Sequence, residues 1–246
     1  MGKQRIHVDL HMHSCLSPCG DNEMTPVNLV GLSALNGLDA IALTDHNISL
    51  NVPAAVLAGE AYGVTVVHGM ELETSEEIHV VCLFPTLELL EEFRQYVVAS
   101  YVQVPNRPEI FGEQRIMNSD DEQTGEYPWL LLAPTGISID DAIPKVLEMG
   151  GVAYPAHVDR DSYSTLSVLG AMPYGYPLHF AEISYECDPE SLFAQYPFMR
   201  EYTLIHASDA HYPQFIADPG AELEVEENTP EGIIKALREL PSGLVL

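Results

Sequence analysis

Three residues near the start of the chain, Asp9, His11 and His13, occupy alternate positions of the segment "HVDLHMHS". Alternate side chains of a β-strand point to one face of the sheet, so the two imidazoles are expected to lie side by side. Paired imidazoles are typical ligands of a transition-metal ion. Taken alone, the pair fits ordinary polar residues at a strand end equally well.

The same residue types recur beside later apolar segments. Histidine, aspartate or glutamate appears in "LTDHN", "GMELE", "EIHVV", "YPAHVDR" and "HASDAH". Six of the ten histidines lie at the candidate positions in these segments and in the first strand, namely His11, His13, His46, His79, His157 and His211. Such residues meet only if the fold brings the ends of separate strands together, so the pattern predicts one metal site built from distant segments.

The segments that position these residues alternate between strand and helix patterns. The predicted strands cover residues 6–10, 38–46, 64–73, 78–84, 152–157, 180–184 and 202–211. The predicted helices cover residues 25–37, 52–63, 87–102, 137–151 and 229–240, and Pro144 is expected to kink or shorten the fourth of them. This alternation predicts an α/β fold with a parallel sheet, and about seven strands suit a closed barrel. In such barrels the chemistry gathers at the carboxyl ends of the strands.

Residues 103–136 do not fit the alternation. The segment is rich in proline and acidic residues and has no clear periodicity. Loops of this length are usually functional lids or disordered linkers, and the aromatic and apolar content favours order. We therefore expect a single domain over residues 1–246, with residues 103–136 as an insertion or cap within it.

Composition narrows the class of protein. There is no apolar run of membrane-spanning length and no apolar core of a signal peptide at the start, which predicts a soluble, cytoplasmic protein. Four cysteines are too few for a disulfide scaffold, so reduced thiols are expected.

The charge balance is strongly acidic. Asp and Glu total 37 against 10 Lys and Arg, which gives a net charge of −27. Binding to long nucleic acid relies on many contacts between basic residues and phosphates, so this surface predicts no long nucleic acid and no membrane as partners. A small phosphorylated substrate would need metal ions or a few placed arginines. The oligomeric state is left open.

The motifs together resemble a known family. "DLHMHS", "TDHN", "GMELE", "IHVV", "AHVD" and "SDAH" are similar to the successive motifs of the polymerase and histidinol phosphatase (PHP) superfamily, in the same order, over nearly the whole chain outside residues 103–136. The resemblance implies a distorted (β/α)7 TIM-like barrel with two or three divalent metal ions at its carboxyl face. It also implies a phosphoesterase.

The resemblance further implies individual ligands. It places His11, His13 and Asp209 at a first ion, Glu71 as a bridge to a second, His79 and His157 at that second ion, and His46, His211 and Asp21 at a third. Asp21 lies in the loop "SPCGDNEM", which has a spacing of its own.

The mixture of imidazole and carboxylate donors suits Zn, Mn or Fe. Adjacent divalent ions acidify a bridging water, and the resulting hydroxide can attack phosphorus. Glu71, Asp209 and His211 are the residues expected to take part in this chemistry.

Few cations are available to hold a phosphate. Arg160 follows His157 by three residues and could bind a phosphate in a bidentate manner, although a salt bridge to a nearby acid is an equal alternative. Arg115 and Arg107, in the expected cap, are weaker candidates for the same task.

Other polar residues are expected to be structural. The remaining histidines are assigned this role: His7, His68, His179 and His206. Asp9 and Asp45 either orient imidazoles through their second ring nitrogen or form ordinary hydrogen bonds at a strand end. Glu73 is interpreted as a solvated acid.

The leading hypothesis is a metal-dependent phosphoesterase acting on a small phosphorylated metabolite or nucleotide. The alternatives are an exonuclease or phosphodiesterase on short oligonucleotides and a non-catalytic metal-binding regulatory module. A metal-dependent hydrolase of C–N bonds is disfavoured, because it usually needs a bridging lysine and Lys3, Lys145 and Lys235 follow no strand end.

Overall fold

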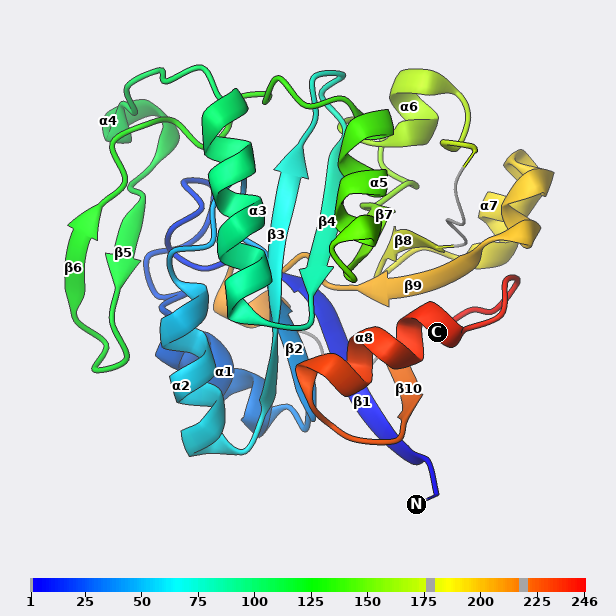
Figure 1. Ribbon diagram of the computed structural model, residues 1–246, viewed down its shortest axis with the longest axis horizontal. Coiled ribbons are helices and arrows are strands. Elements are labelled where there is room, and N and C mark those ends of the chain that lie inside the picture. Colours follow the sequence, from blue (N-terminus) through cyan, green and yellow to red (C-terminus); the bar gives the residue numbers. More distant parts are fainter. Residues whose placement is uncertain (1, 176–179, 217–220) are drawn as a thin grey trace.

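A computed structural model of the chain describes residues 2–175, 180–216 and 221–246 (Figure 1). Six strands form one curled sheet in the order β10-β1-β2-β3-β4-β7. Their bounds are β1 Gln4–Met12, β2 Ala40–Leu43, β3 Thr65–Glu73, β4 His79–Phe84, β7 Val152–Pro155 and β10 Ala221–Val225. A second sheet pairs β8 (Phe180–Ser184) with β9 (Thr203–Ala207) in parallel.

The two sheets meet at the carboxyl end of β1. Met12 forms a parallel bridge with Ala210, and the backbone N–H of His13 donates to the carbonyl of Ala210 at 3.0 Å. On the other side, the N–H of Val158 donates to the carbonyl of Glu182 at 2.9 Å. These contacts bring the ends of strands from both sheets to one place.

The predicted α/β fold is confirmed. The closed (β/α)7 barrel stays a prediction, because the strands form a curled six-stranded sheet and a separate β8–β9 pair. The prediction of a parallel sheet is wrong for part of the larger sheet. β1, β2 and β3 run parallel, whereas β4 is antiparallel to both β3 and β7, and β10 is antiparallel to β1. Residues 74–78 join β3 to β4, and so short a connection allows a hairpin but not a helical crossover.

Helices cover the outside of the larger sheet (Figure 1). They are α1 (Pro26–Leu35), α2 (Val52–Tyr62), α3 (Leu87–Ser100), α5 (Ile139–Glu148) and α8 (Pro230–Glu239), with the shorter α6 (Thr165–Leu169) and α7 (Pro189–Gln195) near β8 and β9. The side chains of Thr25, Thr86, Ser138 and Thr229 cap the N-termini of α1, α3, α5 and α8. Pro144 lies inside α5, which continues past it to Glu148. None of the described helices is long and apolar enough to cross a membrane.

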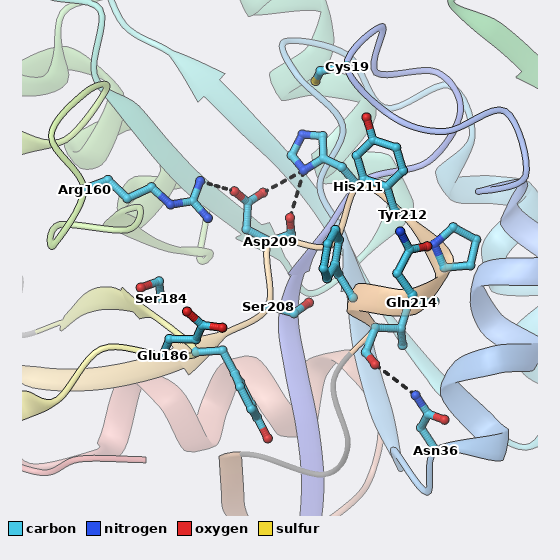
Figure 2. Close-up of a pocket in the computed structure, with 14 residues that line it drawn as sticks. Cys19, Asn36, Arg160, Ser184, Glu186, Ser208, Asp209, His211, Tyr212 and Gln214 are labelled. Atoms are coloured by element: carbon cyan, nitrogen blue, oxygen red, sulfur yellow. Dashed lines mark hydrogen bonds and ion pairs between the residues drawn. The ribbon is translucent and has the colours of Figure 1, made fainter.

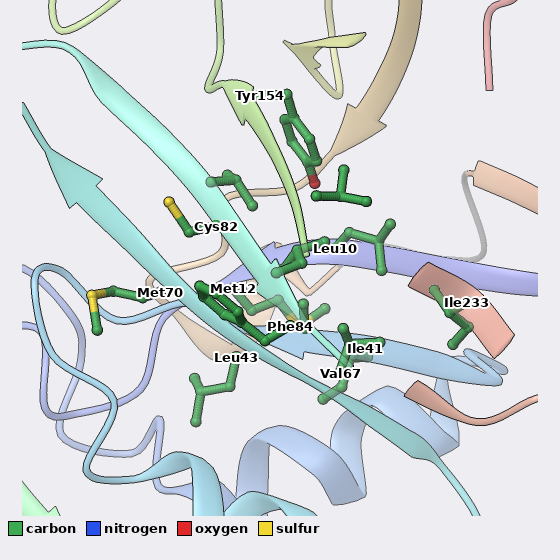
Figure 3. Packing of buried hydrophobic residues seen from close by; sticks show 14 of the residues in the cluster. Leu10, Met12, Ile41, Leu43, Val67, Met70, Cys82, Phe84, Tyr154 and Ile233 are labelled. Atoms are coloured by element: carbon green, nitrogen blue, oxygen red, sulfur yellow. The ribbon is translucent and has the colours of Figure 1, made fainter. Parts of the chain in front are cut away.

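The main core lies between the larger sheet and these helices (Figure 3). Tyr154, Phe84 and Phe93 are among its largest fully buried side chains. Leu10 and Met12 of β1 belong to this core, while the alternate residue His11 points to the opposite face of the strand. β1 therefore contributes core side chains on one face and candidate site side chains on the other.

Residues 103–136 are ordered in the structure. They contain α4 (Pro108–Phe111) and a hairpin of β5 (Arg115–Met117) and β6 (Gln123–Glu126), which projects beside α3 (Figure 1). Gly112 docks the segment on the opening loop: its φ is 103°, and a Cβ there would lie 1.9 Å from the carbonyl oxygen of Pro18. The description of this segment as a cap within one domain stays a prediction.

Candidate metal centre

Histidine and acidic side chains from both sheets converge at the carboxyl end of β1. His11 lies in β1 and Glu71 near the end of β3, while Asp209 follows β9. His79 is the first residue of β4 and pairs with Glu73 across the hairpin. Because β4 runs antiparallel to β3, its amino end reaches the edge where its neighbours end, so the reversal brings His79 to the site.

His157 and Asp209, which also lie at this site, have unusual backbone conformations. The φ angle of His157 is 28° and that of Asp209 is 49°, both in the left-handed region that non-glycine residues rarely adopt. Each is the second residue after the end of a strand. Such conformations persist where the surrounding structure holds them, and they cluster at functional sites.

A first group of donors surrounds one point. The Nε2 atoms of His11 and His13 lie 3.0 Å apart. Oδ1 of Asp209 lies 3.2 Å from the first and 3.0 Å from the second. Each Nε2 is also 3.3 Å from an oxygen of Glu71.

Glu71 also faces a second group. Its Oε1 lies 2.9 Å from Nδ1 of His79 and 3.3 Å from Nε2 of His157. Its Oε2 lies 2.8 Å from Nδ1 of His46. The carboxylate therefore joins the two groups, as expected for a bridging ligand.

A third group consists of His13, His46 and His211, each with a ring nitrogen within 4.8 Å of the others. The rings of His13 and His211 stack with centroids 4.1 Å apart. His13 and His46 thus each belong to two groups.

The donor set fits divalent metal ions. Both oxygens of Glu71, Oδ1 of Asp209 and Nδ1 of His46 are buried, and despite these short distances none of them makes a hydrogen bond of suitable geometry within the described ranges. Unpaired buried polar atoms are costly, so they point to a missing partner. Ligand atoms about 2.1 Å from one ion lie about 3.0–3.4 Å from one another, close to the separations found here.

The pKa shifts of Glu71, Asp209, His46 and His211 favour the same interpretation, whereas the facing carboxylates outweigh burial and raise the pKa values of His11 and His13. Burial alone would raise the pKa values of Glu71 and Asp209, but the facing imidazoles hold both well below the usual range. Burial lowers the pKa of His46 to about 3 and that of His211 to about 4. Ionised carboxylates and neutral imidazoles are the forms that bind metal.

Glu182 supports the site and was not foreseen from the sequence. Its carboxylate oxygens lie 2.9 and 2.8 Å from Nδ1 of His11, and Oε1 accepts from the N–H of His157 at 3.1 Å. The contact orients Nε2 of His11 toward the other donors. Glutamate in the middle of the apolar segment "FAEIS" was the available signal, because a buried acid needs a partner.

Asp45 and Asp9 support the site in different ways. Oδ1 of Asp45 accepts from Ser17 Oγ at 2.7 Å, and this hydroxyl lies 2.9 Å from Nδ1 of His13. Asp9 instead accepts from the backbone N–H of Ser208 at 3.2 Å. The orienting role considered for both aspartates thus reaches an imidazole only from Asp45, through a serine.

The structure does not bring Asp21 into any of the three groups of donors found among the described residues. Its carboxylate accepts from the N–H of Glu23 at 2.8 Å, which closes a turn of the loop. Only its backbone reaches the site, where its N–H donates to the carbonyl of His211 at 2.8 Å.

The two arginines assigned to substrate have different positions. Nη1 of Arg160 lies 2.5 Å from Oδ2 of Asp209, and 42% of the side chain stays exposed at the rim of the site. Arg115 donates to Gln123 at 2.9 Å and to the carbonyl of Asn22 at 3.2 Å, within the hairpin region. Arg107 lies over the ring of Phe111.

Glu73 differs from its interpretation as a solvated acid. It is 5% exposed, and burial raises its pKa to about 7. It lines a pocket of about 260 Å³ together with His46, His79 and His157.

The histidines set aside as structural bond to the backbone where they are described. Nδ1 of His68 lies 3.2 Å from the carbonyl of Phe84, and Nδ1 of His206 lies 3.3 Å from that of Ser184. His7 donates its N–H to Asp39 at 2.8 Å. His179 lies outside the described residues.

A larger cavity of about 910 Å³ opens beside the donors (Figure 2). Arg160, Asp209 and His211 form part of its wall. Cys19 lines both cavities but belongs to none of the groups of donors in the described part of the chain.

Residues 9–127 match the family model of the PHP domain. Within the chain, 78 residues are 33% identical to a 5'-3' exoribonuclease of Haemophilus influenzae. The match covers 30% of this chain and 27% of that protein.

Two solved structures share the fold. The lesion-specific endonuclease Q of Pyrococcus furiosus aligns with a TM-score of 0.65 at 19% identity, over 96% of this chain and 56% of that one. A candidate metal-dependent phosphoesterase of Bifidobacterium adolescentis aligns with a TM-score of 0.57 at 16% identity, over 95% of this chain and 96% of that one. The chain thus spans little more than half of the endonuclease.

These comparisons correct one prediction. The net charge predicts no long nucleic acid as a partner, but endonuclease Q, which shares this fold, has been solved with a 27-mer duplex, and the sequence relative is an exoribonuclease. Overall charge therefore does not exclude such substrates, because a local arrangement of ions and side chains can hold a phosphate. The match of residues 9–127 to the PHP domain model confirms the resemblance of the motifs to this family.

Proposed function

We propose that the protein is a metal-dependent phosphodiesterase that cleaves nucleic-acid strands or oligonucleotides. The observation that carries this proposal is the convergence of buried histidine, glutamate and aspartate donors on one face, with Arg160 at the rim. The arrangement has both a place for cations and a fixed positive charge for a substrate anion.

The proposed cofactors are two or three divalent ions of the Zn, Mn or Fe class. The donors proposed to hold them are His11, His13, His46, Glu71, His79, His157, Asp209 and His211. Imidazole donors favour these metals over Mg or Ca, which prefer oxygen ligands.

When bound, such ions supply an activated water and neutralise charge on the phosphoryl group. Around them, Glu182 fixes the ring of His11, and Ser17 fixes that of His13. Arg160, held by Asp209, presents its remaining N–H groups to a phosphoryl oxygen. These side chains position the substrate before reaction.

Two features support a nucleic-acid substrate. The relative with 33% identity over 78 residues is an exoribonuclease. The cavity of about 910 Å³ is much larger than a phosphate group and extends away from the donors, so it has room for a nucleotide.

A phosphate ester of a small metabolite is the second candidate. Its support is the size of the cavity, which falls in the range of small-molecule sites. The two candidates differ in the bond that is cleaved, namely a diester or a monoester.

The test is hydrolysis of end-labelled single-stranded RNA and DNA by the protein loaded with Mn²⁺ or Zn²⁺, beside a panel of phosphate monoesters. We expect strand cleavage that disappears in Asp209→Asn. Cleavage of monoesters alone would select the second candidate. Metal binding without any hydrolysis would leave a regulatory metal-binding module.

A further inference from the structure

Three aromatic side chains line the larger cavity. Tyr185, Tyr212 and Phe215 are 44%, 40% and 59% exposed, although large aromatic groups are usually buried. Tyr185 follows β8, and the other two follow β9, in the short turn Tyr212–Phe215. We call this set the aromatic wall.

The aromatic wall adjoins the metal centre. Tyr212 directly follows His211, and the cavity that it lines is also lined by Arg160 and Asp209 (Figure 2). The rings of Tyr212 and Phe215 meet edge to face, with centroids 5.9 Å apart and planes at 90°. This contact holds the two rings in different orientations beside the place where a phosphate would bind.

Polar groups complete the same cavity. Gln214, Glu186 and Ser208 line it, and they offer both donors and acceptors (Figure 2). An aromatic face beside such groups is the usual arrangement for an unpaired base, which stacks on the ring and bonds through its edge.

We infer that the aromatic wall is the binding site for the nucleobase attached to the reacting phosphate. This inference rests on the proposed function and specifies its substrate. A base can stack on Tyr212 or Phe215 only when it is unpaired, so the substrate class is a single-stranded nucleotide end or a nucleotide flipped out of a duplex.

The first test compares two single-stranded DNA pentamers, one with a normal terminal nucleotide and one with an abasic terminal residue. Tyr212→Ala and Phe215→Ala should each raise KM for the normal pentamer about tenfold and leave KM for the abasic one unchanged. Tyr212→Phe keeps the ring and should behave as wild type. Tyr62→Ala, an aromatic residue of α2 that is 51% exposed, is the matched control.

The second test measures binding without turnover. The fluorescence of 2-aminopurine nucleoside monophosphate should be quenched by the wild-type protein and by Tyr212→Phe, and less by Phe215→Ala. Absence of quenching by the wild type, or equal loss of activity on both pentamers, would overturn the inference. If the metal-loaded protein cleaves neither RNA nor DNA but still quenches the probe, the proposed function fails and the base site stands.

Discussion

Nδ1 of His11 lies 2.8 Å from a carboxylate oxygen of Glu182, although 171 residues separate the two in the chain. Both side chains are buried. The contact leaves Nε2 of His11 directed at His13, Asp209 and Glu71. A residue that binds no ion itself thus sets the orientation of a proposed ligand.

Glu182→Gln is expected to weaken metal binding roughly ten- to a hundredfold, because the variant loses the charge that holds the His11 ring. Metal affinity would be measured by competition with a chromophoric chelator, and circular dichroism would check the fold. Glu190→Gln is the control, because Glu190 lies on the surface and pairs with Arg200. Unchanged affinity in Glu182→Gln would rule out this positioning role.

The double variant His11→Ala, His13→Ala is expected to contain little metal and to have no activity while remaining folded. Both rings belong to the first group of donors, and Leu10 and Met12 still anchor the strand in the core. Elemental analysis of the purified protein measures the metal content. His206→Gln, which alters a histidine outside the groups of donors in the described ranges, should keep its metal; full activity of the double variant would end the metal hypothesis.

Arg160→Ala is expected to raise KM for phosphate substrates roughly ten- to a hundredfold, because a charged hydrogen bond to the substrate is lost. Metal content should change much less than KM. Steady-state kinetics and elemental analysis on the same preparation separate the two effects. Arg115→Ala removes an arginine held by Gln123 in the hairpin region and should leave KM unchanged. Equal kinetics in Arg160→Ala and wild type would leave Arg160 with only its salt bridge.

His68 predicts a pH dependence of stability. Burial lowers its pKa below 6.5, so the unfolded chain binds a proton more readily than the folded one. Its contribution to the free energy of unfolding is therefore complete above about pH 6.5 and is lost as the pH falls below that value. The drop in the urea midpoint between about pH 7.5 and about pH 5.5 should be smaller in His68→Gln than in wild type. Identical drops would show that His68 does not contribute.

Much of the site was predictable because it follows strand ends. The alternation in "DLHMH" placed His11 and His13 on one face, and the acids and histidines after later strands marked the converging edge. The reversal of β4 was not predicted, because an apolar strand reads the same in either direction and only the short connection 74–78 distinguishes a hairpin. The burial of Glu73 was missed for the same reason, since it depends on that hairpin.

Contacts between residues far apart in the chain could not be predicted from the sequence. Glu182 reaches His11 only because β8 and β9 lie against the larger sheet at the site. The carboxylate of Asp21 accepts from the N–H of Glu23, which closes a local turn, and belongs to none of the groups of donors among the described residues. The spacing of residues alone could not show whether Asp21 closes a local turn or contacts the distant metal site.

The junction of the two sheets at the carboxyl end of β1 has a consequence for the lifetime of the protein. Donors from β1 and β3 belong to the larger sheet, whereas Asp209 and His211 follow β9 of the smaller sheet, beside the bridge of Met12 and Ala210. The two sheets share few backbone bonds there, so bound cations would act as cross-links between them. Ligands that bind only the folded chain stabilise it by mass action. Metal supply would then govern resistance to proteolysis as well as turnover. The junction of the two sheets would be the first place to open when a chelator removes the metal.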